Sequence, residues 1–134
     1  MSSTLYGKIA SLHDLTLSAA LDQVKRLMPR RHFYMRLIPP RPTFAADMTP
    51  EERGVMQQHV VYIHELFQKG NVLIFGPVLD PADNFGMGVF EADNEAEVRS
   101  LMESDPSVRC GLNRFAIFPM IVGAARGKAG DDAR

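Results

Sequence analysis

The chain has 134 residues, which favours a single domain, and 46% of them are apolar, enough for a sizeable hydrophobic core. A net charge of -1 provides no basic footprint for nucleic acid, and the single Cys110 excludes an intramolecular disulfide. No stretch has the composition of a signal peptide or of a membrane span. We therefore expect a soluble, cytoplasmic protein that binds neither nucleic acid nor a membrane.

Residues 1–31 read as an N-terminal helical extension. Asp14 or Thr16 is expected to cap a short amphipathic helix that runs to about Leu27, before a proline breaks it. One interpretation is that this helix packs on the surface of the domain. The alternative is that Met28 is the native start, so that the preceding segment is not part of the protein.

The first strand is predicted from His32 to Ile38, where aromatic and branched residues are frequent. Two prolines, Pro39 and Pro40, end it, because proline cannot donate a hydrogen bond to a neighbouring strand. Residues 41–48 follow and predict a stiff connection marked by a further proline.

The strongest helix signal begins at Thr49. A hydroxyl at the N-cap, Pro50 at the first helical position and Glu52 three residues after the cap form a capping box. We expect this helix to end at Gly70, since glycine adopts the left-handed conformation of a helix end at least cost.

Apolar residues in this helix recur at helical spacing and place His59 near the middle of the buried arc, with His64 outside it. The arc comprises Val55, Met56, Val60, Tyr62, Ile63, Leu66 and Phe67. An imidazole on an apolar face costs free energy unless it has polar partners. His59 is therefore either a core histidine bonded to backbone or water, or a general acid–base group with an unperturbed pKa of about 6.5.

Two further strands are predicted next, over residues 72–78 and 85–92, with turn-forming residues between them. Gly76 and Pro77 lie near the end of the first of these strands. The second contains Gly86 and Gly88, which weaken packing but let a ligand or another backbone approach closely.

The last helix is predicted to begin after Asn94 and to end before Pro106, because the residue before a proline is disfavoured in helical conformation. Residues 112–118 predict the final strand, ended by Pro119. Residues 123–134 are small, polar and charged, and we expect a flexible tail.

The predicted order is β-α-β-β-α-β, an α+β fold of the ferredoxin-like type with a four-stranded antiparallel sheet and two helices on one face. A sheet exposed on one side alternates apolar and polar residues. Here both alternating sets are apolar, as Phe33 and Met35 on one side and Tyr34 and Ile38 on the other illustrate. The second face must then be covered, and we expect a homodimer formed through it.

Four short segments in this order resemble the YCII-related family, which belongs to the dimeric α/β-barrel superfamily. They are His32-Phe33-Tyr34-Met35, Gln58-His59, Phe75-Gly76-Pro77 and Ser104-Asp105-Pro106. The resemblance covers about residues 32–119, within a domain predicted over residues 32–122. It implies that His59 and Asp105 form an acid–base pair and that Gly76 and Pro77 contact substrate. One branch of the family eliminates chloride from a chlorinated hydroxyhydroquinone.

Other candidates have plain structural interpretations. Asp105 is suited to cap a turn that begins at Pro106, and this role is compatible with catalysis because a cap holds the carboxylate in place. Arg41, between two prolines, either binds an anionic group of the substrate or is a solvated loop residue. His59 and His64 diverge by about 140° on the helix, and no histidine or cysteine cluster has the spacing of metal ligands, so we predict no metal.

We therefore predict a small, dimeric enzyme that needs no cofactor. It would carry out proton transfer, isomerisation or elimination on a small aromatic or carbonyl-bearing molecule, with His59 moving the proton and Asp105 orienting or charge-balancing it. The alternative is a non-catalytic module for ligand binding or dimerisation. The sequence names neither the substrate nor the reaction.

Overall fold

A computed structural model of the protein describes residues 16–21 and 30–127. The chain divides into two units, Met1–Arg30 and Arg31–Arg134. In the first unit, the Thr16 hydroxyl accepts a hydrogen bond from the Ala19 amide, so Thr16 caps a short helical segment at residues 17–21. The other predicted cap, Asp14, the predicted helix end at Leu27 and the tail residues 128–134 lie outside the described residues.

The second unit has the predicted β-α-β-β-α-β order, with two additional short helices. Its elements are β1 (Arg31–Ile38), α3 (Phe44–Asp47), α4 (Pro50–Gln68), β2 (Val72–Val78), β3 (Phe85–Ala92), α5 (Glu95–Glu103), α6 (Pro106–Arg109) and β4 (Arg114–Met120). The strands form one antiparallel sheet in the order β2-β3-β1-β4. This is the ferredoxin-like arrangement.

The predicted start and end of α4 are confirmed. Thr49 accepts a hydrogen bond from the Glu52 amide while the Glu52 carboxylate accepts one from the Thr49 amide, which completes the capping box. At the other end Gly70 has a φ of 89°, and the Asn71 amide donates to the Leu66 carbonyl. This is the Schellman pattern, in which a left-handed glycine satisfies the last carbonyl groups of the helix.

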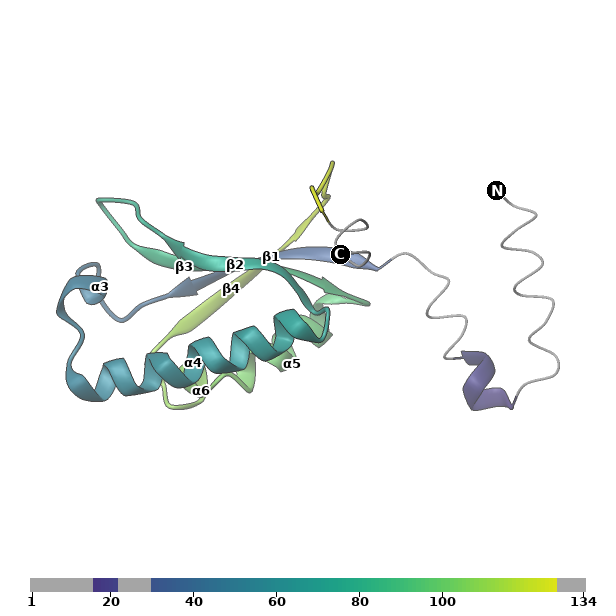
Figure 1. Ribbon diagram of the computed structural model, residues 1–134, viewed down its shortest axis with the longest axis horizontal. Coiled ribbons are helices and arrows are strands. Elements are labelled where there is room, and N and C mark those ends of the chain that lie inside the picture. The colour runs from purple at the N-terminus through teal and green to yellow at the C-terminus, as the bar shows by residue number, and fades with distance from the viewer. Residues whose placement is uncertain (1–15, 22–29, 128–134) are drawn as a thin grey trace. The chain divides into compact units, whose positions relative to one another are not determined.

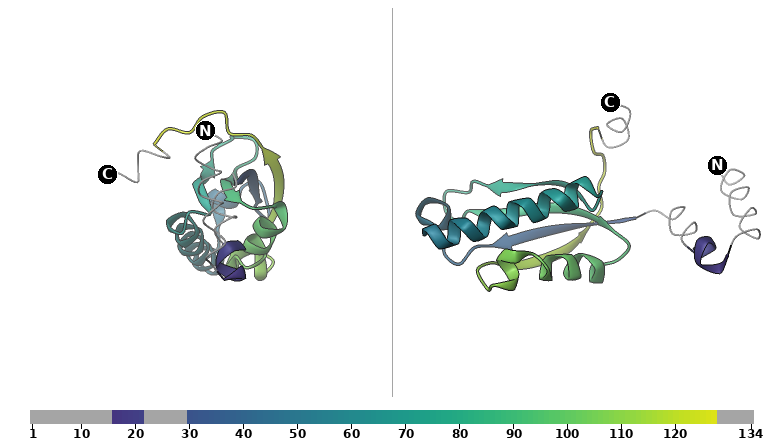
Figure 2. Two further views of the ribbon diagram at one scale, coloured as in Figure 1. Left: turned by 90° about the vertical axis from the view of Figure 1, so that its right-hand side faces the viewer. Right: turned by 60° about the horizontal axis from the view of Figure 1, so that its bottom comes forward.

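One face of the sheet carries α4, α5 and the short α6. Figure 1 shows α4, α5 and α6 on the same side of the strands, and the second view of Figure 2 shows α4 running alongside α5 and α6. The core lies between these layers. Its buried residues are Phe33, Met35, Leu37, Ile63, Leu66, Val72, Phe90, Ala92, Val98 and Met102.

The other face of the sheet, called the open face below, is also largely apolar. The strand registers place on it Tyr34, Ile38, Ile74, Val78, Phe85, Met87, Val89, Ala116, Phe118 and Met120. Ile74 and Phe118 are 57% and 50% exposed. Polar groups on this face include Arg36, which lies over the Phe85 ring, and His32, which is bonded to Glu91.

Strand β2 departs from the regular alternation of side chains between the two faces of a sheet. Regular alternation would place Val72 and Ile74 together, but the register against β3 shifts between them. Val72 and Phe75 consequently both lie on the helix-covered face, and Ile74 lies on the open face. A β-bulge of this kind inserts an extra residue and reverses the alternation beyond it.

Strand β4 differs from the prediction in its bounds. It spans Arg114–Met120 rather than residues 112–118, and Pro119 pairs with Phe33 instead of ending the strand. β4 is an edge strand, so the missing N–H of proline need not remove a bond to a neighbour. The buried arc of α4 is also narrower than predicted, since Val60 and Phe67 are about half exposed.

No helix in the described segments of the chain is long and apolar enough to cross a membrane.

Candidate active site

His59 and Asp105 are in direct contact. The Nδ1 atom of His59 lies 2.6 Å from Oδ2 of Asp105, although the two residues are 46 positions apart in the sequence. His59 comes from the middle of α4 and its side chain is 12% exposed, whereas Asp105 precedes α6 and is fully buried. The contact thus joins two helical segments at the edge of the core.

The chain around Asp105 holds its carboxylate in place. Pro106 confines the preceding residue to an extended conformation, and Asp105 has φ and ψ of -63° and 127°. Its Oδ1 atom accepts hydrogen bonds from the Ser107 amide at 2.8 Å and the Ser107 hydroxyl at 3.0 Å. With His59 on Oδ2, three donors offset the cost of burying a charged group.

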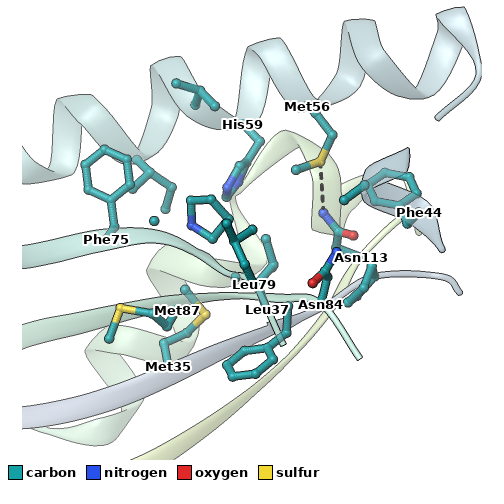
Figure 3. A pocket seen from close by; sticks show the side chains of 18 of the residues that line it. Met35, Leu37, Phe44, Met56, His59, Phe75, Leu79, Asn84, Met87 and Asn113 are labelled. Atoms are coloured by element: carbon teal, nitrogen blue, oxygen red, sulfur yellow. Dashed lines mark hydrogen bonds between the residues drawn. The ribbon is translucent and has the colours of Figure 1, made fainter. Parts of the chain in front are cut away.

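This contact determines which nitrogen of His59 is available for chemistry. An ionised carboxylate only accepts hydrogen bonds, so Nδ1 of His59 carries the proton that bonds to Asp105. In the neutral ring Nε2 is then the unprotonated atom and can accept a proton. Figure 3 shows the ring projecting from α4 among the residues that line a cavity.

Tyr62 lies one helical turn after His59 and secures α4 against α5. Its hydroxyl donates to the Leu101 carbonyl at 2.6 Å. Burial is the main effect that raises the pKa of Tyr62, and the negative charge of Asp105 adds to it, so the hydroxyl keeps the proton that it donates.

A cavity of about 400 Å³ opens beside His59, between α4 and the sheet. Its lining residues are Met35, Leu37, Pro39, Phe44, Ala45, Met48, Met56, His59, Val60, Ile63, Phe75, Gly76, Pro77, Leu79, Asn84, Phe85, Gly86, Met87 and Asn113. Only His59, Asn84 and Asn113 among them have polar side chains other than thioethers. Gly76 and Pro77, predicted as substrate contacts, are part of the lining.

Gly86 on β3 forms part of the wall of this cavity. Gly86 and Gly88 pair with Leu37 and Met35 on the helix-covered face, where other positions carry core side chains. A Cβ atom on Gly86 would lie 3.1 Å from the Leu37 Cβ, so a larger residue would crowd the strand as well as fill the cavity.

Arg41 does not line this cavity. Its guanidinium binds both carboxylate oxygens of Glu52, at 2.8 and 2.9 Å, and the Asp47 carboxylate at 2.8 Å. These bonds raise the pKa of Arg41, and the Arg41 hydrogen bonds are the main cause that lowers the pKa of Glu52 to about 2. Arg41 therefore ties α3, whose Phe44 lines the cavity, to the start of α4.

Within residues 16–21 and 30–127, no group of three or more histidine, cysteine, aspartate or glutamate side chains is arranged to hold a metal ion.

Sequence reasoning missed three residues that shape this site: Ser107, Tyr62 and Asn113. Ser107 was detectable, because an N-cap aspartate commonly accepts from the residue two positions later. Helical periodicity predicts Tyr62 on the buried arc, but its hydrogen bond to the Leu101 carbonyl of α5 depends on how the helices pack. Asn113 falls within the strand predicted over residues 112–118, whereas in the structure it lies just before β4 and is 2% exposed.

Comparisons with known proteins identify a matching domain family and solved structures with a similar fold. The sequence profile of the YCII-related domain family matches residues 32–121. Among solved structures, a similar one is 5-chloro-2-hydroxyhydroquinone dehydrochlorinase (TftG) from Burkholderia phenoliruptrix AC1100 in complex with 2,5-dihydroxybenzoquinone. The two share 20% identity with a TM-score of 0.52, covering 68% of this chain and 95% of that one. This likeness shows a shared fold.

Uncharacterized protein TM1266 from Thermotoga maritima is more distant, with 10% identity and a TM-score of 0.43 over 70% of this chain and 100% of that one. No curated protein sequence matches the chain.

Proposed function

This chain belongs to the YCII-related domain family, and from that premise we propose that it is a small enzyme that uses His59 and Asp105 for acid–base chemistry. The observation that carries the proposal is the 2.6 Å contact between these two side chains at the wall of an apolar cavity. A buried carboxylate that orients a histidine beside a ligand-sized space is a recurrent arrangement for general acid–base catalysis.

In the proposed reaction Nε2 of His59 removes a proton from the bound molecule. The negative charge of Asp105 stabilises the imidazolium that forms and keeps the ring in place. The electron pair left on the substrate forms a new π bond. In an isomerisation the proton returns to a different atom, and in an elimination a leaving group departs with its own electron pair.

The proposed substrate is a small, uncharged and hydroxylated or carbonyl-bearing ring. The cavity lies within the usual range of small-molecule pockets, roughly 300–1,000 Å³, and no lysine, arginine, aspartate or glutamate lines it. The dehydrochlorinase with the same fold is named for a chlorinated hydroxyhydroquinone. Because Arg41 is engaged by Glu52 and Asp47, we leave it out of the proposed substrate site.

We further propose that the protein is a homodimer formed through the open face of the sheet. The support is the apolar character of that face, where Ile74 and Phe118 remain half exposed in a single chain. Contiguous apolar surface of this kind is typical of an interface.

The test compares His59→Asn with His64→Asn. In His59→Asn, the amide nitrogen of the new side chain lies near the position of the histidine Nδ1. It can still donate a hydrogen bond to Asp105, whereas the base Nε2 is absent. His64 lies on the same helix, is exposed and does not line the cavity, so it serves as the matched control. Chloride release from 5-chloro-2-hydroxyhydroquinone and hydrogen–deuterium exchange at the ring carbons of hydroquinone are measured by ion chromatography and NMR.

We expect His59→Asn to lower the rate about 10²–10⁴-fold, the usual contribution of a general acid–base group, and His64→Asn to leave it near wild type. Equal rates in the wild type and His59→Asn would refute the proposal. Binding of the ring compounds without any turnover would favour the alternative, a ligand-binding module, which the apolar lining of the cavity also suits.

A further inference from the structure

The cavity beside His59 is larger than the ring of the proposed substrate needs. Its volume is about 400 Å³. An apolar cavity of about 150 Å³ is enough to hold a benzene ring, and two hydroxyl groups enlarge that ring only modestly. A single dihydroxylated ring in contact with His59 therefore leaves roughly half of the cavity unfilled. Unfilled space deprives the surrounding side chains of van der Waals contacts, so a ligand that fills it binds more tightly.

The lining of this cavity has a buried part and an exposed part. Met35, Leu37 and Ile63 are almost completely buried. In contrast, Val60 is 52% exposed and Leu79 is 75% exposed, although both line the same cavity. A residue that lines a cavity and also contacts solvent lies at its opening. Val60 and Leu79 are together called the rim below.

The two rim residues come from the two sides of the cavity. Val60 directly follows His59 on α4, and Leu79 directly follows β2. Figure 3 shows Leu79 and α4 on opposite sides of the cavity, with the His59 ring projecting between them. The His59 side chain is only 12% exposed, so the proposed base lies further inside than the rim. A substituent that extends from a ring at His59 towards solvent consequently passes the rim.

The opening of the cavity is apolar. Its exposed lining residues are Ala45, Val60, Pro77 and Leu79, and none of them has a polar side chain. Exposed apolar surface that adjoins a pocket is typical of a place where a ligand binds. Because the rim continues the apolar lining, one ligand can occupy both the inner part of the cavity and its opening.

We propose that the ligand of this cavity is a hydroxylated or carbonyl-bearing ring with an uncharged apolar substituent, such as a short alkyl chain, that lies against Val60 and Leu79. This inference rests on the proposed function for the place of the ring beside His59, but it concerns binding and not turnover. No lysine or arginine lines the cavity, so a substituent that ends in a carboxylate would lose its hydration without gaining a partner.

The experiment measures dissociation constants for resorcinol, 4-ethylresorcinol and 4-butylresorcinol by NMR titration. The three probes share one dihydroxylated ring and differ only in the length of an alkyl chain. A fourth probe, 3-(2,4-dihydroxyphenyl)propanoic acid, has a chain of similar length that ends in a carboxylate.

Binding is compared in the wild type, in Val60→Ser and in Leu79→Ser. Val61→Ser is the matched control for Val60→Ser, because Val61 is the next residue of α4. Ile121→Ser is the control for Leu79→Ser, because Ile121 is also an apolar residue just after a strand. Both control residues are at least as exposed as the rim residues they match, and neither lines the cavity.

We expect the Kd of the wild type to fall along the alkyl series by about twofold to fourfold for each methylene group, the upper value being that of full burial. The acid should bind no more tightly than resorcinol. Val60→Ser and Leu79→Ser should each raise the Kd of 4-butylresorcinol by about twofold to tenfold, with little effect on resorcinol. The two control variants should resemble the wild type.

Three results would overturn the inference. The first is a Kd that does not depend on chain length, or a wild type that binds none of the alkyl compounds. The second is equal affinity for the acid and for 4-butylresorcinol. The third is an equal effect of the rim substitutions and their controls, which would show that the chain does not lie against the rim.

The same variants test whether protein, and not a ligand, covers the rim. Surface substitutions usually change stability little, so Val60→Ser and Leu79→Ser should shift Tm by no more than about 4 °C and leave the mass measured by light scattering unchanged. A larger fall in Tm or a change of oligomeric state that the controls do not share would contradict the inference.

The two proposals fail in different ways. If affinity rises along the alkyl series but His59→Asn leaves every measured rate unchanged, the inference stands and the proposed enzyme function fails. If His59→Asn abolishes turnover of a ring compound while affinity does not depend on chain length, the function stands and the inference fails.

Discussion

His59 meets Asp105 through one carboxylate oxygen only, Oδ2, while the other oxygen caps α6 through Ser107. The cap and the acid–base contact therefore use different atoms of the same side chain and do not compete. A substitution can therefore remove the negative charge of Asp105 and still leave an oxygen that caps α6.

Asp105→Asn should preserve the cap and disrupt the pair. The amide oxygen can still accept from Ser107, but the amide nitrogen would face Nδ1 of His59 with a proton of its own. The ring would then favour the tautomer with its proton on Nε2, which cannot act as a base. We expect the rate to fall about 10²–10⁴-fold, in line with the effect of disturbing a histidine tautomer elsewhere.

The ring ¹⁵N chemical shifts of His59 report the tautomer directly. A wild-type pattern in Asp105→Asn, or an unchanged rate, would contradict the assigned role of Asp105. Thermal unfolding of the same variant checks that the cap on α6 is retained.

The Arg41–Glu52 pair should make stability depend on acidity. Hydrogen bonds from Arg41 and then from the Thr49 amide lower the pKa of Glu52 from 4.5 to about 2. Because the folded-state pKa is the lower one, this stabilisation is fully present above about pH 4.5 and is lost as the pH falls towards 2.

Glu52→Gln removes that carboxylate while an amide oxygen can still complete the capping box. Urea unfolding measured between pH 2 and 6 should therefore show a shallower loss of stability in acid for this variant. Arg41→Gln should likewise make the free energy of unfolding depend less on pH. Combining the two substitutions should reduce this pH dependence little further than either substitution alone. If the effects of the two substitutions on the slope of unfolding free energy against pH were fully additive, Arg41 and Glu52 would act independently of each other.

Ile74→Lys should weaken the proposed homodimer. A lysine at this position would be buried without a counter-ion at an apolar interface, which costs several kcal/mol and corresponds to a rise in Kd of roughly 100-fold or more. Val61→Lys is a suitable control because Val61 is similarly exposed, at 60%, but lies on α4.

Light scattering at micromolar concentration measures both variants. Dissociation by Ile74→Lys but not by Val61→Lys is expected. A monomeric wild type, or equal dissociation by both, would count against an interface on the open face. Phe75, the neighbouring residue, is not a suitable probe because it lies on the helix-covered face.

Residues 1–27 should be dispensable for folding of the domain. The family match begins at residue 32, and the second unit of the chain begins at Arg31. A chain that starts at Met28 should melt within a few degrees of the full-length protein in differential scanning calorimetry. Aggregation of the shorter chain would indicate instead that the N-terminal segment covers apolar surface of the sheet.

Local signals in the sequence determined most of the elements. The capping box at Thr49, the glycine at position 70 and Asn94 act through backbone groups within a few residues of themselves, so they specify helix ends without reference to the rest of the fold. The inward orientation of His59 followed from helical periodicity in the same way. Periodicity overestimated the buried arc, however, because how far a helix is covered depends on what lies against it.

Only the tertiary structure decided which distant groups meet. The bulge in β2 depends on pairing with β3, and it places Val72 and Ile74 on opposite faces of the sheet, where regular alternation would have kept them together. The bond between His59 and Asp105 was implied by family resemblance, but its geometry and its choice of oxygen arise from packing α4 against α6 and the sheet. Such contacts join residues that local patterns do not relate, because the free energy of packing is shared over the whole core.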